Sequence, residues 1–399
     1  MQSENRSKSN SEPSLFYLLY TFLIIGSMSF GGYSSLVAMV KEKLVDKKRL
    51  LNDAIILEGF TLASLLPGPV AVNTVAYIGF YLRGWLGAVI SFVAVIFPSF
   101  VFVVALAHFY LIYAEIPAVS GLLKGVTPVI LAIILSVSYK LGKGHILTYK
   151  HIIILVIGLA VQVVWSGYLS FVICLLIGGL VGVFLLEANT EESKRAVPQA
   201  KNSYALMKPL FVIILIVVPL VFWIGYNNNL NTQLALTFGK VSLTLFGGGY
   251  VMIPILEDIL VVNLEWLTTQ EFVDAIAIGQ VTPGPILISA AFVGYKLNGV
   301  LGSAIATFFI FTPSSLLMIL LSSKVEHVKN NIFWQKAMNG IKPMVISFIL
   351  YSIWVIFSKI DYLEVAVSIF VIAAILLIKY KVNFVYLVIA SALLGIFIF

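Results

Sequence analysis

The chain has 399 residues, of which 60% are hydrophobic and only 11% are charged, and its mean hydropathy is +1.05. Because a soluble domain is nearer a quarter charged, this composition excludes a soluble globular protein and indicates an integral membrane protein. Its apolar stretches have the length of membrane helices of about 20 residues rather than barrel strands, so we predict an all-α, polytopic fold.

Residues 1–14 are polar and are predicted to form a tail. They lack the apolar core and the small-residue cleavage site of a signal peptide, so we do not expect them to be one. The single cysteine, Cys174, lies in an apolar run and excludes both an internal disulfide and a cysteine metal cluster. The net charge of +7 lies mostly in loops. This pattern is typical of the excess of Lys and Arg in cytoplasmic loops, and attraction of anions is the alternative interpretation.

A first apolar segment, Leu15–Val40, contains Phe30-Gly31-Gly32, and two shorter arms, Ala54–Leu66 and Val70–Leu82, meet at Pro67-Gly68-Pro69. Proline lacks a backbone N–H and glycine weakens a helix, so the triplet is expected to break the helix. Each arm is too short to span a bilayer comfortably, and the pair is either a re-entrant hairpin or two half-helices stacked end to end. Longer apolar runs follow at 84–113, 122–141, 152–165 and 168–186. Pro98-Ser99, and later Pro313-Ser314, are expected to kink their helices, with the serine hydroxyls bonding to backbone groups that the kink frees.

The same pattern then repeats. Phe246-Gly247-Gly248 and Pro283-Gly284-Pro285 follow their first counterparts by 216 residues, and Pro313-Ser314 follows Pro98-Ser99 by 215. We therefore predict two homologous repeats. Their expected bounds are 15–187 and 231–399, and the linker between them, 188–230, contains an extra apolar segment at 209–226.

The two repeats are predicted to have inverted topology. The loop after the first apolar segment has five basic residues at positions 41–49, whereas the equivalent loop at 256–274 has none. Since cytoplasmic loops favour Lys and Arg, equivalent loops are expected on opposite sides of the membrane. The number of crossings stays open. If 209–226 spans, either Leu15–Val40 does not cross fully or the Pro-Gly-Pro pair crosses once.

The two Pro-Gly-Pro breaks predict a binding site, because open backbone at membrane depth survives only inside protein or along a watery cavity. A helix that restarts after each break presents unpaired N–H groups and a positive dipole end, which favour an anion. Simple packing of short helices and glycines is the alternative. The candidate substrate-binding residues are the two breaks, their polar neighbours and the paired glycines: Gly31, Gly32, Pro67, Gly68, Pro69, Asn73, Gly247, Gly248, Gln280, Thr282, Pro283, Gly284, Pro285 and Ser289.

Glu58 and Asp274 each lie nine residues before a break. An ionisable group at membrane depth suggests proton coupling, and a position at the membrane interface is the alternative. Arg83 and Lys296 end the arms after the breaks. We expect them to anchor the chain at the interface or to attract an anion as gating residues.

Motif searches favour a protein that is not an enzyme. The sequence has no Walker loop, no metal-ligand spacing among its four histidines, and no basic patch for nucleic acid. We therefore expect no catalytic residues, no cofactor, no bound metal and no nucleic-acid partner.

The ordered set of Phe-Gly-Gly, an acidic residue, Pro-Gly-Pro, Gly-x-x-Gly and Pro-Ser, present twice, resembles the chromate ion transporter (CHR) family in its two-domain form. The stretches that carry it are 30–32, 58–73 and 84–99, with 246–250, 274–289 and 299–314. The resemblance implies a secondary transporter in the bacterial inner membrane that exports chromate, confers resistance, and is driven by protons or the membrane potential. Ser64 departs from the glutamine that members often have there, which Gln280 retains in the second repeat.

Several alternatives remain. Sulfate is an expected competitor, and the chain could equally carry sulfate or another small oxyanion as its own substrate. A passive channel is a further alternative, and a membrane-embedded enzyme is less favoured. Besides the oxyanion, the expected partners are the lipid bilayer and protons; a homodimer is left open.

Overall fold

The computed structural model describes residues 13–29, 33–114, 116–165, 168–187, 229–246, 249, 252–322 and 331–399. Most of the predicted linker, its apolar segment at 209–226, and the glycine pairs Gly31-Gly32 and Gly247-Gly248 lie outside the described residues. Every regular element within the described ranges is helical, which confirms the all-α class.

The first half begins with short helices and continues with long ones. Asn52 caps one of the short helices by accepting a hydrogen bond from the N–H of Ile55 at 3.0 Å. The elements are α1 (Leu15–Met28), α2 (Tyr33–Val40), the π-helix η1 (Lys41–Lys47), α3 (Asp53–Leu65), α4 (Val70–Tyr113), α5 (Pro117–His145), α6 (Tyr149–Val164) and α7 (Tyr168–Leu185).

The second half repeats this order. Its elements are α10 (Asn229–Thr244), α11 (Met252–Glu257), the π-helix η4 (Asp258–Asn263), α12 (Thr269–Val281), the 3-10 turn η5 (Ile286–Ile288), α13 (Ser289–Leu321), α15 (Ile332–Phe357), α16 (Leu363–Ile378) and α17 (Phe384–Ile398). Even irregular backbone recurs: Arg49 and Glu265, at equivalent positions, both have φ of 51°. Sequence and local geometry thus repeat together.

The arms around the first break form a hairpin. Gly59 of α3 faces the side chains of Tyr77 and Thr74 in α4, so the two helices lie side by side rather than end to end. The chain then folds back again within α4 at Arg83-Gly84, where helical dihedrals are lost. Gly79 and Gly87 meet across this second bend so closely that a β-carbon on either would overlap the other's carbonyl.

Pro98 does not break α4. Helical dihedrals continue through Pro98, and the irregular residues of this element are Arg83 and Gly84. The second half is alike, because Asn298 and Gly299 carry the irregular dihedrals of α13 and Pro313 does not. A proline inside a helix removes one N–H bond and crowds the preceding turn without forcing the chain to reverse, whereas glycine tolerates the positive φ of a sharp reversal.

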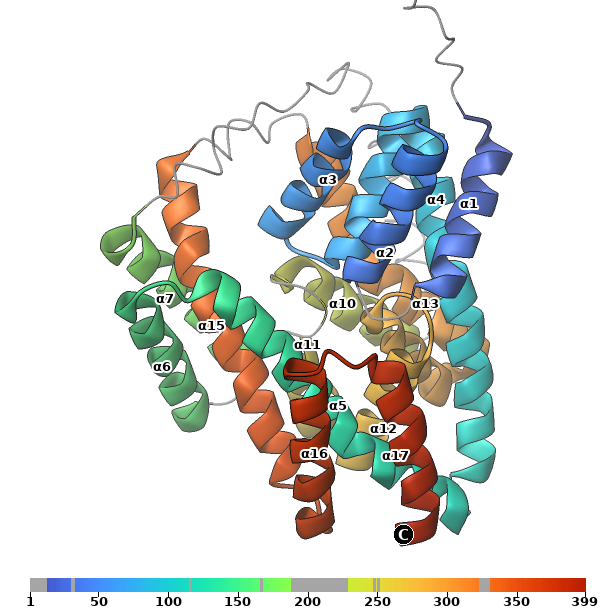
Figure 1. The fold of residues 1–399 in the computed structure, drawn as a ribbon, viewed down its shortest axis with the longest axis vertical. Coiled ribbons are helices and arrows are strands. Elements are labelled where there is room, and N and C mark those ends of the chain that lie inside the picture. The colour runs from blue at the N-terminus through green and yellow to red at the C-terminus, as the bar shows by residue number, and fades with distance from the viewer. Residues whose placement is uncertain are drawn as a thin grey trace, which may run out of the picture.

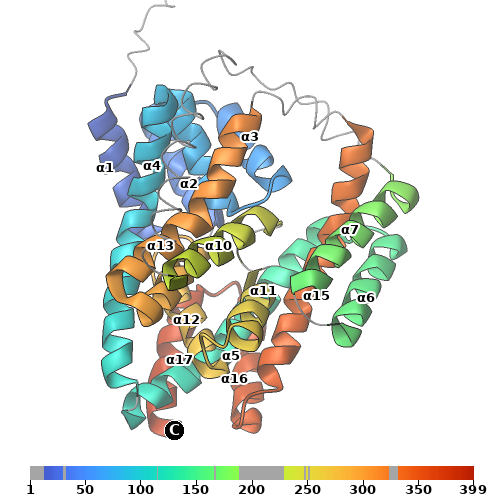
Figure 2. The same cartoon turned by 180° about the vertical axis from the view of Figure 1, so that it is seen from behind.

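The two halves interlock. α5 of the first half packs against α16 and α17 of the second, whereas its equivalent α15 packs against α6 and α7 of the first. In Figures 1 and 2, α6, α7 and α15 lie on the opposite side of the molecule from α4, and α5, α16 and α17 lie between them in the lower part. Gly125 allows α17 to approach α5 closely at Gly395, as small residues do between membrane helices. The halves therefore form one folded unit.

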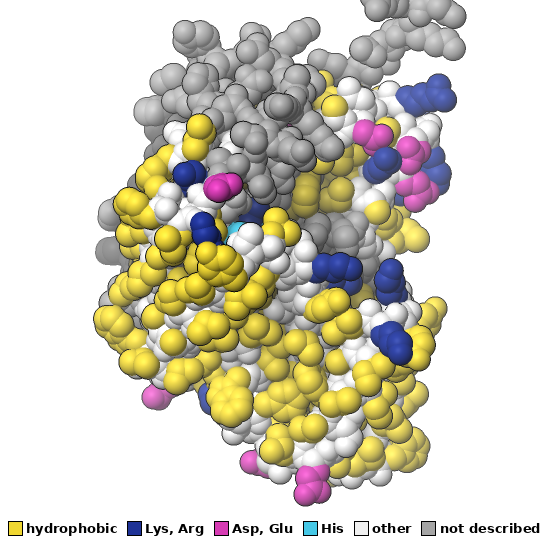
Figure 3. Space-filling model, turned by 60° about the vertical axis from the view of Figure 1, so that its left-hand side comes forward, with side chains coloured by type: hydrophobic (Ala, Val, Ile, Leu, Met, Phe, Trp, Pro, Cys, Tyr) yellow, Lys and Arg dark blue, Asp and Glu magenta, His cyan; other side chains and the backbone are white. Residues whose placement is uncertain are grey.

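The described helices fit a multi-pass membrane protein. Four of them, within 70–113, 117–145, 286–321 and 332–357, are long and apolar enough to span a bilayer. The surface in Figure 3 is largely apolar, with charged side chains gathered at the upper right, a few acidic ones at the lower end, and several Lys or Arg at mid-height. α1 has 14 residues and reaches about 21 Å, short of the ~30 Å hydrocarbon core. Its length favours the alternative in which the first apolar segment does not cross fully.

Candidate functional site

Each Pro-Gly-Pro break, called an elbow from here on, is tethered to the opposite half. The N–H of Gly68 donates to the carbonyl oxygen of Leu245 at 2.6 Å, and that of Gly284 donates to the carbonyl oxygen of Ser29 at 2.8 Å. Ser29 and Leu245 hold equivalent positions, directly before the two Phe-Gly-Gly motifs. The two elbows thus occupy reciprocal places at the boundary between the halves.

Only glycine fits the centre of each elbow. Gly68 and Gly284 have φ of 123° and 111°, which side chains of L-residues rarely permit. A β-carbon on Gly68 would overlap Ser314, and one on Gly284 would overlap Ser99. These serines belong to the Pro-Ser pairs of the opposite halves, so sequence positions that lie more than 180 residues apart are packed in contact.

The Pro-Ser hydroxyls have a different role from the one expected. The Oγ of Ser99 donates to the carbonyl oxygen of Pro283 at 2.5 Å, across the boundary between the halves, instead of bonding within its own helix. Ser314 does donate to its own helix, at Phe311, and also accepts from the hydroxyl of Ser242 at 3.1 Å. The expectation that these hydroxyls serve their own kinked helices is therefore wrong for Ser99.

The polar neighbours of the elbows are buried. Asn73 is inaccessible to solvent, accepts from the hydroxyl of Ser315 at 2.7 Å, and donates to Pro67 at 3.4 Å. Thr282 donates to the carbonyl oxygen of Gly279 at 3.1 Å. Gln280 and Ser289 are buried beside the second elbow, where the turn η5 precedes α13. Sequence-predicted site residues therefore do gather around both elbows.

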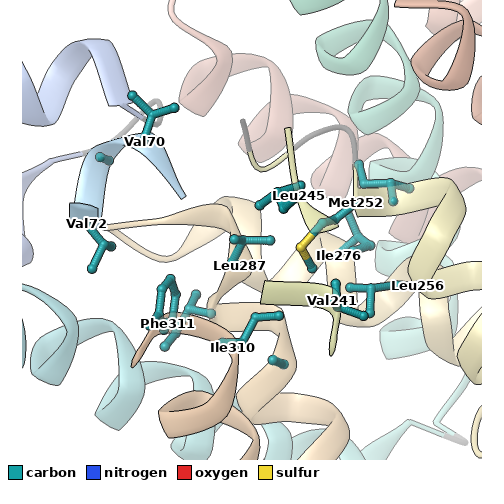
Figure 4. Close-up of a cluster of buried hydrophobic side chains, with 14 of the residues drawn as sticks. Val70, Val72, Val241, Leu245, Met252, Leu256, Ile276, Leu287, Ile310 and Phe311 are labelled. Carbon is teal, nitrogen blue, oxygen red and sulfur yellow. The ribbon is translucent and has the colours of Figure 1, made fainter. Parts of the chain in front are cut away.

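Helix α4 begins immediately after the first elbow, with Pro69 as its N-cap residue. The N–H of Asn73 is the first to bond back, to the carbonyl oxygen of Pro69 at 3.0 Å. The N–H groups of the three preceding residues have no acceptor within the helix, as at any helix start. Figure 4 shows apolar side chains around this start and the second elbow, among them Val70, Leu245 and Leu287. An anion there would meet backbone donors within apolar surroundings.

The two carboxylates before the elbows are buried rather than exposed. Asp274 is 2% exposed and accepts hydrogen bonds from the hydroxyl of Tyr110 at 2.8 Å and the amide of Gln270 at 2.9 Å. Glu58 is 7% exposed and interacts electrostatically with Tyr77. Both groups are therefore enclosed by protein, and their role in proton coupling stays a prediction.

The cations that end the arms make contacts within the protein. A guanidinium nitrogen of Arg83 donates to the carbonyl oxygen of Pro13 at 3.0 Å. The ammonium group of Lys296 pairs with the carboxylate of Glu271 at 2.5 Å. Arg83 thus holds the start of the chain against the bend in α4, and Lys296 ties α13 to the start of α12.

A cavity of about 220 Å³ lies beside the first elbow, between α3, α5 and α15. Ser64, Val70 and Phe246 line it near the elbow, and His145 and Lys342 line it on the side of α5 and α15. His145 and Lys342 were not among the predicted site residues, because both lie far from the two breaks in the sequence. A lysine in the middle of the long apolar run 332–357 is the signal that could have identified Lys342.

A second cavity, of about 520 Å³, adjoins the first. It shares His145 and Lys342 with the inner cavity and is also lined by Lys150, His151 and Glu187. The two shared residues therefore border both cavities, one beside the elbow and the other beside the start of α6. Among the described residues, no three His, Cys, Asp or Glu side chains gather as metal ligands would.

The equivalent place in the second half is packed differently. There α12 packs directly against α5, whereas the inner cavity separates α3 from α15. Thr127 and Ile360 hold the positions equivalent to Lys342 and His145. The two elbows are thus alike in backbone and unlike in surroundings.

Comparisons with known proteins agree with this architecture. A family model described as chromate transporter matches residues 16–183 and 232–396. A chromate transport protein of Cupriavidus metallidurans is 30% identical over 314 residues, covering 76% of this chain and 73% of that protein. One from Pseudomonas aeruginosa is 27% identical over 399 residues, covering 98% and 93%. An uncharacterized transporter of Methanocaldococcus jannaschii is 27% identical over 396 residues, covering 98% and 96%. No solved structure matches.

Proposed function

The chain belongs to the chromate transporter family, and from this premise we propose that it is a secondary active transporter that exports chromate from the cytoplasm. The observation that carries the proposal is the reciprocal tether of the two elbows, Gly68 to Leu245 and Gly284 to Ser29. It brings two broken helices to the boundary between two repeats, which is where transporters of this architecture bind substrate. Because the chain is a transporter and not an enzyme, its site needs hydrogen-bond donors for the anion and a route for it through the protein, rather than catalytic groups.

We propose that the repeats have inverted topology. In Figure 1, α5 runs upward along the chain and its equivalent α15 runs downward. In Figure 3, Lys and Arg gather in the upper half of the molecule, and most charged groups at the lower end are acidic. Since Lys and Arg favour the cytoplasmic side, the upper end faces the cytoplasm in this proposal.

Cysteine labelling tests the orientation. Lys47 and Asn263 are exposed, equivalent positions at the ends of η1 and η4, and Cys174 is buried. In a Cys174→Ser background, Lys47→Cys is expected to react with a membrane-impermeant maleimide only from the cytoplasmic side. Asn263→Cys should react only from outside, as intact cells and inside-out vesicles can distinguish. Labelling of both cysteines from one side would exclude inverted repeats.

We propose that the structure is open toward the cytoplasm, because the outer cavity is lined by Lys150 and the shared Lys342, and Lys and Arg favour the cytoplasmic side. A dianion that enters there leaves a negative-inside cell with electrical assistance of about 2.3 kcal/mol per charge per 100 mV. Sulfate is a tetrahedral dianion like chromate, so we expect competition, and sulfate or another small oxyanion is the alternative substrate. Placement in a bacterial inner membrane, resistance to chromate, and coupling to protons through Glu58 or Asp274 are parts of the same proposal.

Uptake by inside-out vesicles tests export directly. Vesicles that contain the protein are expected to accumulate labelled chromate when energised and to lose this activity with an uncoupler, because the driving force is the gradient. Excess sulfate should reduce the rate. Vesicles without the protein are the control. Robust sulfate uptake without chromate uptake would move the substrate to the alternative, and uptake unaffected by uncoupler would show that the gradient does not drive transport.

A further inference from the structure

We propose that the inner cavity beside the first elbow is the loading site for a tetrahedral dianion, and that Lys342 supplies its positive charge. This inference rests on the proposed function and assigns binding to residues outside the elbows themselves. Lys342 lies near the middle of α15, a 26-residue helix long enough to span the membrane. A lysine at that depth is expensive to keep, and such residues usually mark a substrate path.

The electrostatics of this cavity favour an anion. No Asp or Glu is among the residues that line it, and most of the others are apolar, such as Phe60, Leu65 and Val345. Val70, the first residue of α4, lines the same space, so the positive end of that helix reaches the cavity. A cation, a helix start and low-polarity walls together strengthen attraction for a dianion, since charges interact more strongly away from water.

The position of Lys342 and His145 also suits selection. Both residues line the inner cavity and the outer one, so a solute that moves between them must pass these side chains. A lysine ammonium is a compact charge with three donors, which does not require the planar geometry that arginine prefers. Glu187 lines only the outer cavity, so the anion would leave the acidic group behind as it moves inward.

The second half shows what makes the cavity. Ser64 lines it, whereas the equivalent Gln280 is a larger side chain and is buried beside the closely packed α12 and α5. Thr127 stands at the place equivalent to Lys342. Two differences, a small residue and a cation, therefore distinguish the open side from the packed side. The loading site is a property of the first elbow and not of both.

Binding of labelled chromate to the purified full-length protein tests this assignment. Lys342→Gln is expected to raise the Kd for chromate at least tenfold, because it removes a charged hydrogen-bond donor. Lys342→Arg should restore binding to within about threefold, since the charge is kept. Lys336→Gln is the matched control, because Lys336 lies on the same helix outside the residues that line the cavity, and it should bind like wild type.

Ser64→Gln provides an independent test that keeps the charge. A glutamine there would occupy the space that serine leaves, so we expect weaker chromate binding with an unchanged unfolding temperature. If the wild-type protein transports chromate and either Lys342→Gln or Ser64→Gln binds chromate with wild-type affinity, the loading site would be refuted. The proposed function would stand in that case. A wild-type protein that neither binds nor moves chromate would instead refute the proposed function. If Lys342→Gln fails to fold, Ser64→Gln decides the question.

Discussion

Gly284→Ala is expected to abolish chromate transport while the protein still inserts into the membrane. The new β-carbon would overlap the hydroxyl of Ser99, and the backbone φ of 111° would be strained. Relief requires the elbow to move from its tether at Ser29, which would displace the start of α13. Because misplacement by about 1 Å can cost roughly a hundredfold in rate, we expect at least that loss in vesicle uptake.

Two matched variants separate overlap from strain. Gly299 also has positive φ, 54°, but nothing lies near its added β-carbon, so Gly299→Ala should cost only about 1–2 kcal/mol of stability and keep most transport. Adding Ser99→Ala to Gly284→Ala removes the overlapping hydroxyl and should restore part of the activity. Wild-type uptake by both Gly284→Ala and Gly68→Ala would refute the role of the elbows in transport.

Asp274→Asn is expected to remove the pH dependence of transport. The carboxylate is buried, and its two oxygens accept hydrogen bonds from Tyr110 and Gln270. These bonds fix its position inside the protein, where we expect it to take up and release a proton. An asparagine cannot take up or release a proton, and its amide would face one of two donors, with a stability loss of about 1 kcal/mol. Chromate uptake measured across a series of pH values should become flat and slower.

Tyr110→Phe is the control for this prediction. It removes one hydrogen bond to Asp274 and leaves the carboxylate able to titrate, so the pH dependence should persist although its midpoint changes. A flat profile in Tyr110→Phe would assign the effect to packing of α4 against α12. An unchanged profile in Asp274→Asn would show that this carboxylate does not couple transport to protons, and Glu58→Gln would then be the variant to examine.

Much of the architecture was predictable because it depends on local constraints. Pro67-Gly68-Pro69 and its repeat break helices wherever they occur, and the common spacing of Gly and Pro residues predicts a second half with the same elements. The all-α class follows from apolar runs that must satisfy their backbone inside a membrane. The place of the sharp bend at Gly84 also agrees with the predicted boundary between the second arm, which ends at Leu82, and the next apolar run, which begins at residue 84.

How the two halves meet could be learned only from the folded molecule. Nothing in the spacing of residues tells that Ser99 bonds to Pro283, that α5 packs against α17, or that a cavity opens beside Ser64 and closes beside Gln280. From the residues alone, a repeated, membrane-embedded helical module with two broken helices could be predicted. The contacts that give the elbows their different surroundings join residues that lie far apart in the sequence. Such contacts leave no periodic signal, because they depend on the shapes of whole helices rather than on the preferences of single residues.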